Sequence, residues 1–437
     1  MKRFSIRTLG CKVNQYETEA MEELFLRRGY VRAEDERSDV FVVNTCTVTS
    51  LSDGKCRQQI HRVKRQNPDA IVAVVGCYSQ VSPEEIQKID GVDIILGTKG
   101  RAEIVDLVEQ FERQRQPILR VGELTGQRFF DELSIETQLS MTRAYIKIQE
   151  GCEMFCTYCI IPHARGKIAS RELAQIGDEA NRLAGKGFRE VVLTGIHVAS
   201  YGKDWKNGIG LIDAIERVAA IPAIERIRLS SIEPRWVDGE RLRRMKATGK
   251  VCGHFHLSLQ SGSDAVLHAM NRRYTTDLYR EKIALIRSVF PDAGITTDVI
   301  VGFPGESEEH FEQTMGFCRE TQFSKIHIFP YSPRKGTPAA DFPDQVSGPV
   351  KKQRAHRLGE LEEQMRFAFL DRHIGRTVNV LFEELSGDAE TMLGYTENYM
   401  RVRVPRRIDD LNRVRQVFLT SREEGILCGR LLNEEAE

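Results

Sequence analysis

The chain has no long hydrophobic run, no signal-peptide core at its start and no excess of charge of either sign. Its longest aliphatic runs, such as Ile71 to Val75, are far shorter than the ~20 residues that a membrane-spanning helix needs. Because the N-terminus leads directly into a strand-like segment, we expect a cytoplasmic protein that makes no membrane contact. Lys plus Arg and Asp plus Glu both number 63, so any attraction to nucleic acid must be local.

Cysteine is the residue type that stands out, with 10 copies in 437 residues. In a long chain without an export signal, cysteines indicate metal or catalytic chemistry rather than disulfides. The length allows about three domains of roughly 150 residues each, and 41% hydrophobic residues are ordinary for a globular protein. The spacing of the cysteines therefore carries the first information on function.

Residues 1–120 alternate short apolar runs with amphipathic stretches, which predicts a small doubly wound α/β domain with a parallel sheet. A helix is expected over Gln15–Arg28, where Asn14 and Glu17 resemble a capping pair. A second helix is expected over Asp53–Gln66. The expected strands are Phe4–Leu9, Val40–Asn44, Ile71–Val75 and Val92–Leu96.

Three cysteines occupy equivalent places in this domain, because Cys11, Cys46 and Cys77 each lie just past the carboxyl end of an expected strand. Open α/β sheets bind ligands at that edge, and the following helix N-termini favour thiolates. Three converging thiolates suit an iron-sulfur cluster with one open iron, or a zinc site with a further ligand. The alternative is that they are small buried core residues. Cys56, within a helix, is expected to be a plain helix residue.

The segment from Val121 to Leu139 is polar and aperiodic, which predicts a linker. Residues 138–370 then repeat a strand-helix pattern, which predicts a partial parallel (β/α)6 barrel with its chemistry at the strand C-termini. The expected strands are Ala144–Gln149, Glu190–Thr194, Arg226–Ser230, His254–Leu259, Thr296–Val301 and Lys325–Phe329. The expected helices include Glu172–Ala184, Leu211–Ala220, Thr276–Val289 and Ser307–Glu320.

A second cysteine triplet follows the first barrel strand, in the segment GCEMFCTYC that contains Cys152, Cys156 and Cys159. Cysteines at this spacing can wrap one 4Fe-4S cube and leave one iron free to chelate a substrate. The spacing, with Tyr158 before the last cysteine, resembles the radical S-adenosylmethionine (radical-SAM) signature. A zinc site completed by His163 is the alternative.

The other barrel strands end in small and hydrogen-bonding residues. Glycine lets a ligand approach the backbone, and Ser, Gln and Asp side chains can hold the ribose, amino group and carboxylate of S-adenosylmethionine. For each residue the alternative is an ordinary βα turn. The candidate cofactor-binding residues are Tyr158, Gly195, Ser231, Glu233, Gln260 and Asp298.

Two basic or titratable pairs lie in the same region. Arg272 and Arg273 are candidate ligands of a carboxylate or a phosphate, and a solvated basic pair is the alternative. His254 and His256 alternate along an expected strand, so they either point into the barrel or are satisfied core histidines.

The C-terminal region, residues 371–437, follows a long charged helix at about Val350–Asp371. Its short strands predict a small β-barrel. The expected strands are Thr377–Glu383, Gly394–Glu397, Met400–Val404, Gln416–Thr420 and Gly425–Leu431.

A basic stripe is expected on this barrel, because strand alternation puts Arg401 and Arg403 on one face. Tyr395 and Tyr399 are nearby for stacking, so the stripe suits RNA. A solvated edge strand protected by its charge is the alternative. The candidate RNA-binding residues are Arg401, Arg403, Arg406 and Arg407.

Four further segments complete the set of motifs: TLGCKVNQYE at 8–17, NTCTVT at 44–49, GCY at 76–78 and VGFPGE at 301–306. Together with the second cysteine triplet they resemble the radical-SAM methylthiotransferase family over nearly the whole chain. The resemblance implies an N-terminal methylthiotransferase domain, a radical-SAM core and a C-terminal RNA-binding TRAM domain. The opening motif is most similar to the threonylcarbamoyladenosine tRNA methylthiotransferase subgroup.

The resemblance also implies S-adenosylmethionine and two 4Fe-4S clusters as cofactors. The cluster on Cys152, Cys156 and Cys159 would cleave S-adenosylmethionine to a radical, which removes hydrogen from carbon 2 of the modified adenosine at tRNA position 37, 3′ of the anticodon. A second cluster, on the N-terminal cysteines named above, would carry the sulfur that is methylated and transferred. In the family a low-potential donor of the flavodoxin or ferredoxin type supplies electrons.

Four other functions stay open on the sequence. Within the family, the substrate is alternatively an isopentenyladenosine tRNA or an aspartate of a ribosomal protein. In a different class, the chain is a zinc-stabilised RNA-binding protein without catalysis. The last alternative is a radical enzyme with a single cluster, whose N-terminal domain binds a nucleotide.

Overall fold

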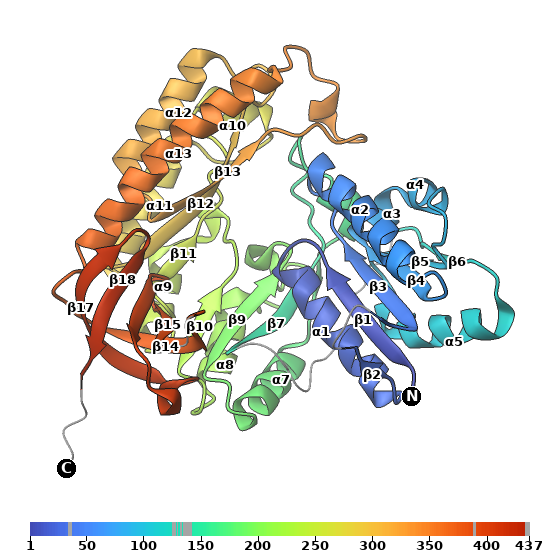
Figure 1. Ribbon diagram of the computed structural model, residues 1–437. Helices are drawn as coiled ribbons and strands as arrows, with labels where there is room; N and C mark the ends of the chain where they lie inside the picture. The colour runs from blue at the N-terminus through green and yellow to red at the C-terminus, as the bar shows by residue number, and fades with distance from the viewer. Residues whose placement is uncertain are drawn as a thin grey trace.

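Figure 1 shows the computed structural model as an α/β body at the right, a partial barrel in the centre and a small closed β-barrel at the lower left. The structure describes residues 1–33, 37–124, 128, 130–131, 133, 142–387 and 390–432. The predicted α/β fold class is confirmed, whereas most of the predicted linker lies outside the described residues. Within the described part, none of the helices combines the length and the apolar character that crossing a bilayer requires.

The N-terminal body is a parallel sheet of order β2-β1-β3-β4-β5-β6 with helices on both faces. Alternate strand residues face opposite layers, because Val40 and Val42 pack with α1 and α5 while Phe41 and Val43 pack with α2 and α3. The strands are β1 (Arg3–Thr8), β2 (Val31–Arg32), β3 (Val40–Thr45), β4 (Ile71–Gly76), β5 (Ile94–Leu96) and β6 (Ile118–Arg120). The helices are α1 (Lys12–Arg27), α2 (Ser50–Gln66), α3 (Cys77–Val81), α4 (Pro83–Gln87) and α5 (Ile104–Gln114).

Helix α1 begins three residues before the predicted start, and its N-cap is Cys11. The predicted capping pair is therefore wrong. The Asn14 side-chain amide instead donates to the carbonyl oxygens of Leu9 at 2.8 Å and Thr45 at 2.9 Å, which fastens α1 to the sheet edge. Glu17 points into a buried cluster of cations described below.

The central body is a partial barrel of parallel strands in chain order, as predicted, with helices outside. Bridges from Ile227 to Val251 and from Ile232 to Leu257 join its two sheets at β10 and β11. The parallel strands are β7 (Arg143–Glu150), β9 (Glu190–Gly195), β10 (Arg226–Leu229), β11 (His254–His256), β12 (Gly294–Val301) and β13 (Lys325–Pro330), and β8 (Ala169–Ser170) pairs antiparallel with β7. The helices are α6 (Ile161–Arg165), α7 (Leu173–Gly185), α8 (Leu211–Ala219), α9 (Gly239–Ala247), α10 (Asp264–Ala269), α11 (Thr276–Val289), α12 (Glu308–Thr321) and α13 (Gly348–Asp371).

The C-terminal body is a closed barrel of order β14-β15-β16-β18-β17 around an apolar interior that includes Val402, Val404 and Leu427. It is fixed to the bottom of the central barrel by arginines, because Arg228 donates to the carbonyl oxygens of Thr396 and Glu397, each at 2.7 Å. The strands are β14 (Thr377–Leu385), β15 (Thr391–Thr396), β16 (Arg401–Pro405), β17 (Val414–Glu423) and β18 (Ile426–Leu431).

A buried ionic cluster joins the N-terminal body to the central barrel. Glu17 of α1 is fully buried and accepts hydrogen bonds from Arg101 at 2.8 Å, Lys147 at 3.1 Å and Arg165 at 3.1 Å. Glu150 of β7 lies on the same cations. Burial would raise the pKa of Glu17, but the surrounding cations outweigh that effect and lower its pKa well below the ordinary value.

Glu17→Gln removes one carboxylate from this buried cluster and leaves an excess of buried positive charge. We expect the free energy of unfolding at pH 7 to fall by about 3–5 kcal/mol, the usual cost of breaking a buried ion pair. Urea denaturation measures the change. Since the pKa of Glu17 is lowered on folding, its stabilisation is present above the ~4.3 pKa of a free glutamate and is lost at lower pH.

The control for this prediction is Glu112→Gln, which removes the exposed ion pair with Lys2. An exposed pair is worth about 0–1 kcal/mol, so this variant should stay close to the wild type. Equal losses in the two variants, or a Glu17→Gln deficit that does not shrink as the pH falls below about 4, would contradict the role given to Glu17.

Candidate active site

The N-terminal cysteine triplet lies at the carboxyl edge of the sheet, as predicted. Cys11 follows β1, Cys46 follows β3, and Cys77 begins α3 after β4. A Cβ on Gly10 would lie 2.9 Å from the Cβ of Cys46, so the absence of a side chain there permits the close approach of the two cysteine loops. Besides burial, the thiols of Cys46 and Cys11 contribute to raising the pKa of Cys77.

Arg165 is the residue that connects this triplet to the central barrel. It comes from α6 and is fully buried, and its Nε donates to the Sγ of Cys77 at 3.1 Å. Burial raises the pKa of Cys77 to about 12, and the Arg165 guanidinium opposes the shift. Cys56 lies behind the site with its Sγ 3.5 Å from the carbonyl oxygen of Cys46, closer to the triplet than its sequence position indicated.

The second triplet lies in the loop between β7 and α6, at the mouth of the barrel. The Cys159 amide donates to the Cys156 carbonyl at 2.9 Å, and the Cys152 amide donates to the Gly166 carbonyl at 3.0 Å, so both ends of the loop are held. A Cβ on Gly151 would lie 1.9 Å from the Lys167 carbonyl oxygen, which only glycine permits. Burial raises the pKa of Cys152 to about 11 and that of Cys159 to about 12.

Arg272 serves the second triplet as Arg165 serves the first. Its Nη1 donates to the Sγ of Cys156 at 3.3 Å, and its Nε donates to the Tyr274 hydroxyl at 3.0 Å. Arg273 is exposed, so only Arg272 of the predicted basic pair contributes to the site. Each cysteine triplet therefore has one arginine that donates to a cysteine sulfur.

This donor set fits an iron-sulfur cube. Three thiols leave one iron without a protein ligand, and a guanidinium is a suitable hydrogen-bond donor to thiolate sulfur. A tetrahedral zinc ion would need its ligand atoms about 4 Å apart. Within the described residues, neither triplet has all its donor atoms within 4.8 Å of one another, with or without His163, whose side chain is exposed on α6.

The predicted cofactor-binding residues fall into two groups. Gln260 and Asp298 are neighbours, because the Gln260 amide donates to the Asp298 carbonyl at 2.8 Å, and Gln260 holds a left-handed φ of 70°. The other four have different neighbours. Gly195 lies against Gln149, Ser231 is exposed, Glu233 accepts from Arg235 at 2.7 Å, and Tyr158 packs on the apolar cluster around Phe303.

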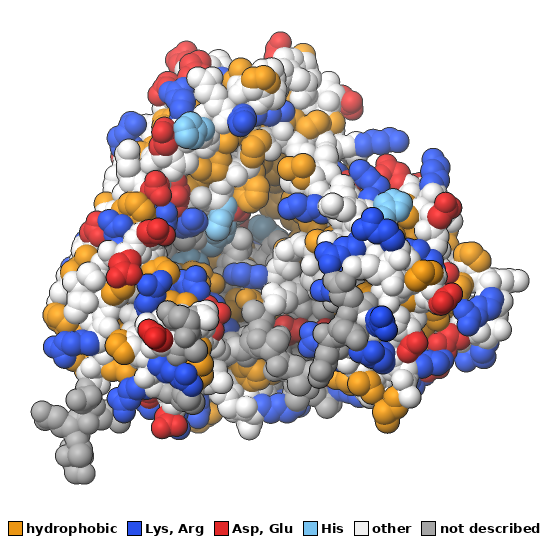
Figure 2. Space-filling model, in the orientation of Figure 1, with side chains coloured by type: hydrophobic (Ala, Val, Ile, Leu, Met, Phe, Trp, Pro, Cys, Tyr) orange, Lys and Arg blue, Asp and Glu red, His pale blue; other side chains and the backbone are white. Residues whose placement is uncertain are grey.

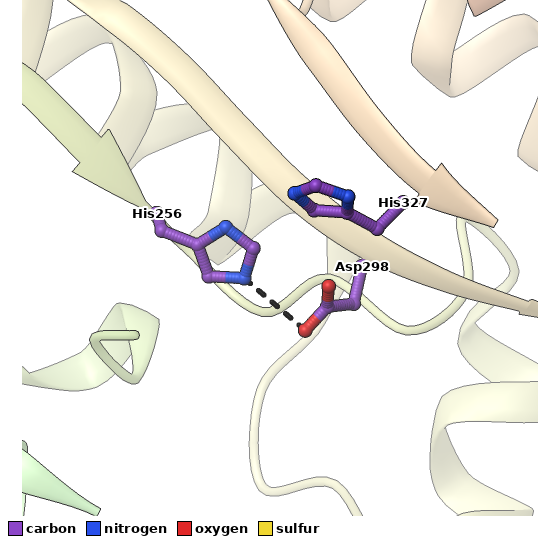
Figure 3. A group of neighbouring side chains, drawn as sticks. All are labelled: His256, Asp298 and His327. Carbon is purple, nitrogen blue, oxygen red and sulfur yellow. Dashed lines mark hydrogen bonds and ion pairs between the residues drawn. The ribbon is translucent and has the colours of Figure 1, made fainter. Parts of the chain in front are cut away.

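A group of side chains inside the barrel adds His327, which the sequence did not single out. Figure 3 shows His256, Asp298 and His327 pointing toward one another from β11, β12 and β13. His256 bonds the Asp298 carboxylate at 3.1 Å and the Thr296 hydroxyl at 2.9 Å, and the Thr296 hydroxyl also contacts His254 at 3.2 Å. His254 and His256 thus point into the barrel. The three drawn groups are close enough to hold an ion, but both ring nitrogens of His256 already have partners.

The predicted basic stripe on the C-terminal barrel exists but is partly neutralised. Arg401 pairs with Glu384 at 2.6 Å, Arg403 with Glu423 at 2.9 Å, and Arg407 with Asp410 at 3.5 Å. Arg406 is exposed beyond the end of β16.

Tyr395 and Tyr399, predicted to stack on bases, instead contact the central barrel. The Arg143 guanidinium lies 4.9 Å from the ring of Tyr395, and the Arg228 guanidinium lies 4.6 Å from that of Tyr399.

The fold defines the class of protein. The structure resembles the radical S-adenosylmethionine methyltransferase TsrM from Kitasatospora setae, with a TM-score of 0.58, 18% identity, and coverage of 78% of this chain and 77% of that chain. It also resembles the cobalamin-dependent S-adenosylmethionine radical enzyme OxsB, with a TM-score of 0.51, 11% identity, and coverage of 83% and 56%. At these identities the likeness concerns the fold alone, which is that of a radical-SAM enzyme.

Sequence comparison identifies the family. Residues 146–318 match the radical SAM superfamily, and residues 3–97 match the uncharacterized protein family UPF0004. The threonylcarbamoyladenosine tRNA methylthiotransferase MtaB of Bacillus subtilis is 43% identical over 92% of this chain and 90% of its own length. The tRNA-2-methylthio-N(6)-dimethylallyladenosine synthase of Moorella thermoacetica is 36% identical over 99% of each chain. The chain belongs to the radical-SAM methylthiotransferase family, whose members use S-adenosylmethionine and a 4Fe-4S cluster.

If the second triplet holds the expected 4Fe-4S cluster, Arg272→Met should make the reduction potential of that cluster more negative. The variant removes the guanidinium that donates to Cys156, and hydrogen bonds to cluster sulfur raise the potential. We expect a shift of about −60 mV, the equivalent of a tenfold change for one electron, in a redox titration followed by electron paramagnetic resonance. Arg273→Met, on the exposed neighbour, is the control. Equal potentials in the two variants would show that the contact is not retained in the loaded enzyme.

Proposed function

We propose that this enzyme inserts a methylthio group at carbon 2 of threonylcarbamoyladenosine at position 37 of tRNA, in the cytoplasm. The observation that carries the proposal is the contact made by Arg165. This residue belongs to α6, the helix that follows the second triplet, and its side chain donates to Cys77 of the first triplet. One side chain thus links two sulfur-rich sites at one barrel mouth, as a radical step followed by sulfur transfer requires. The relatives named for threonylcarbamoyladenosine support the choice of substrate.

The cofactors would be two 4Fe-4S clusters and S-adenosylmethionine. Cys152, Cys156 and Cys159 would hold the first cluster, and the N-terminal cysteines would hold the second. When bound, these groups would supply the hydrogen-abstracting radical and the sulfur. The N-terminal cysteines are Cys11, Cys46 and Cys77.

The chain's own residues would position these groups. Arg272 and Arg165 would each donate to a ligand sulfur, which stabilises the thiolate form. Asp298, oriented by its hydrogen bond to His256, would accept from a hydroxyl or amino group of S-adenosylmethionine. The remaining cofactor contacts that we propose are Tyr158, Gly195, Ser231, Glu233 and Gln260. Electrons would come from a flavodoxin or ferredoxin type donor.

The three bodies would divide the work. Residues 1–120 would be the methylthiotransferase domain, residues 138–370 the radical-SAM core and residues 371–437 a TRAM domain that binds tRNA. In that domain Arg401, Arg403, Arg406 and Arg407 would contact phosphates, exchanging their carboxylate partners for the RNA backbone.

The second candidate is an isopentenyladenosine tRNA methylthiotransferase, because relatives named for dimethylallyladenosine are 36% identical over nearly the whole chain. Mass spectrometry of tRNA nucleosides from cells lacking the gene separates the two. We expect loss of methylthio-threonylcarbamoyladenosine with its unmethylthiolated precursor retained. Unchanged levels of methylthio-threonylcarbamoyladenosine would contradict the proposed substrate. Loss of the methylthiolated isopentenyladenosine would establish the second candidate.

Cys46→Ala tests the second cluster. The wild type purified without oxygen should contain about eight iron per chain, from two cubes, and the variant about four. The variant should still cleave S-adenosylmethionine while it fails to restore methylthiolation in the gene-deleted cells. Cys252→Ala, on a buried cysteine outside both triplets, is the control. Full iron content and activity in Cys46→Ala would favour the single-cluster alternative.

The basic stripe is tested by the salt dependence of tRNA binding. Each phosphate contact contributes about 0.7–0.9 to the slope of log affinity against log salt. The double variant Arg401→Gln, Arg403→Gln should therefore lower the slope by about 1.4–1.8. The matched control is Arg422→Gln. Arg422 lies on β17 of the same barrel and forms an ion pair with Asp371 at the end of α13. A slope equal to that of the control would show that these arginines do not contact tRNA phosphates, and would favour the alternative of a solvated edge strand protected by its charge.

A further inference from the structure

His327 is a polar side chain of the barrel interior that makes no hydrogen bond to any residue in the described part of the chain. It projects from β13 toward His256 and Asp298, and its ring centroid lies 5.8 Å from that of His256 (Figure 3). The imidazole is exposed to solvent. Figure 2 shows this face of the molecule hollowed at its centre, between the α/β body and the barrels, with histidine side chains inside. A ligand that enters the barrel can therefore reach His327.

The polar neighbours of His327 are already bonded to one another. His256 Nε2 lies 3.1 Å from the Asp298 carboxylate, and His256 Nδ1 lies 2.9 Å from the Thr296 hydroxyl. The same hydroxyl lies 3.2 Å from Nε2 of His254. This network fixes the side chains around His327 and uses both ring nitrogens of His256, whereas both ring nitrogens of His327 remain available.

The His327 imidazole is neutral at pH 7. Partial burial lowers its pKa from the ordinary value, although the Asp298 carboxylate opposes that shift. A neutral imidazole offers one hydrogen-bond donor and one acceptor. It is therefore suited to a polar ligand group that carries both carbonyl and hydroxyl oxygens.

A second exposed side chain lies on the same face of β13. The strand register pairs Asp298 with His327 and Ile300 with Phe329, and side chains alternate along a strand, so Phe329 also faces the barrel interior. Ile328 faces the opposite way and packs on the apolar core. Phe329 is 43% exposed, and its ring has no aromatic or cationic partner among the described residues. Its face is open to a planar ligand.

We propose that this face of β13 is the subsite for the target nucleoside, with Phe329 stacked on the adenine ring and His327 hydrogen-bonded to the substituent on N6. This inference rests on the proposed function, since the threonylcarbamoyl group carries carbonyl, hydroxyl and carboxylate oxygens whereas the isopentenyl group is apolar. The two residues are about 7 Å apart along the strand, which matches the reach of an N6 substituent from the centre of a purine ring. An isopentenyl group would cover the imidazole without offering it a partner, which disfavours that substrate.

The test measures binding of two anticodon stem-loops to the cluster-loaded enzyme by fluorescence anisotropy. One carries threonylcarbamoyladenosine at position 37, and the other carries unmodified adenosine there. We expect the wild type to prefer the modified loop by about tenfold, the equivalent of one good hydrogen bond. His327→Phe should bind the two loops equally, with its affinity for the unmodified loop unchanged. His327→Gln, which keeps a donor and an acceptor, should retain part of the preference.

Phe329→Ala should have the complementary effect. Stacking acts on the adenine ring, so this variant should bind both loops about tenfold more weakly and keep the ratio between them. Phe329→Tyr, which keeps an aromatic face, should bind both loops as the wild type does. A change in the ratio with Phe329→Ala, or unchanged affinity for both loops, would contradict the stacking role.

His356→Phe, on an exposed histidine of the outer helix α13, is the matched control and should keep the preference of the wild type. A His327→Phe variant that still prefers the modified loop would overturn the inference. Weaker binding of S-adenosylmethionine in His327→Phe or Phe329→Ala, measured by equilibrium dialysis, would also overturn it, because the subsite would then belong to the adenine of the cofactor. Failure of the proposed function has a different signature, since deletion of the gene would then leave methylthio-threonylcarbamoyladenosine unchanged in the nucleoside assay.

Discussion

The carboxylate of Glu17 is the point on which the arrangement of the active site depends. It is buried, and it keeps its charge only because Arg101, Lys147 and Arg165 surround it. Lys147 and Arg165 belong to the central barrel, so the charge is fully compensated only when the N-terminal body is docked on that barrel. An uncompensated buried carboxylate is costly, which makes the docked arrangement strongly preferred over any partly open one. The position of Cys77 relative to the barrel follows from that preference.

Sequence patterns predict well those elements whose apolar residues recur at short, regular spacing. The buried strands of both α/β bodies were predicted within a few residues, because buried parallel strands are continuous apolar runs between turn signals. The short strands β2, β6 and β8 were missed, because two or three residues form no such run. Both cysteine triplets lie at strand ends for the same reason. The predicted capping role of Asn14 failed because a tertiary partner, the carbonyl of Thr45, outcompeted the local one. Arg165 and His327 carried no local signal, since their partners are distant in sequence.

The C-terminal barrel illustrates a different limit of sequence patterns. Alternation along β16 correctly placed Val402 and Val404 inside and Arg401 outside. It could not show which tyrosines would remain free, because the guanidinium groups of Arg143 and Arg228 that cover them belong to β7 and β10. The C-terminal barrel is therefore held by stacked arginines and backbone acceptors. These contacts with the central barrel, rather than a linker, set the orientation of the C-terminal barrel relative to the mouth of the central one.

With the two proposed clusters in place, the contact between Arg165 and Cys77 would also couple the loading of the two cysteine sites. The helix α6 that carries Arg165 follows directly on the loop of the second triplet, so a cluster that ordered this loop would also fix the donor to Cys77. By linkage, an event that orders one site raises the affinity of the other by the same factor that it gains in return. Assembly of the holoenzyme would then be cooperative, with few half-loaded molecules at equilibrium.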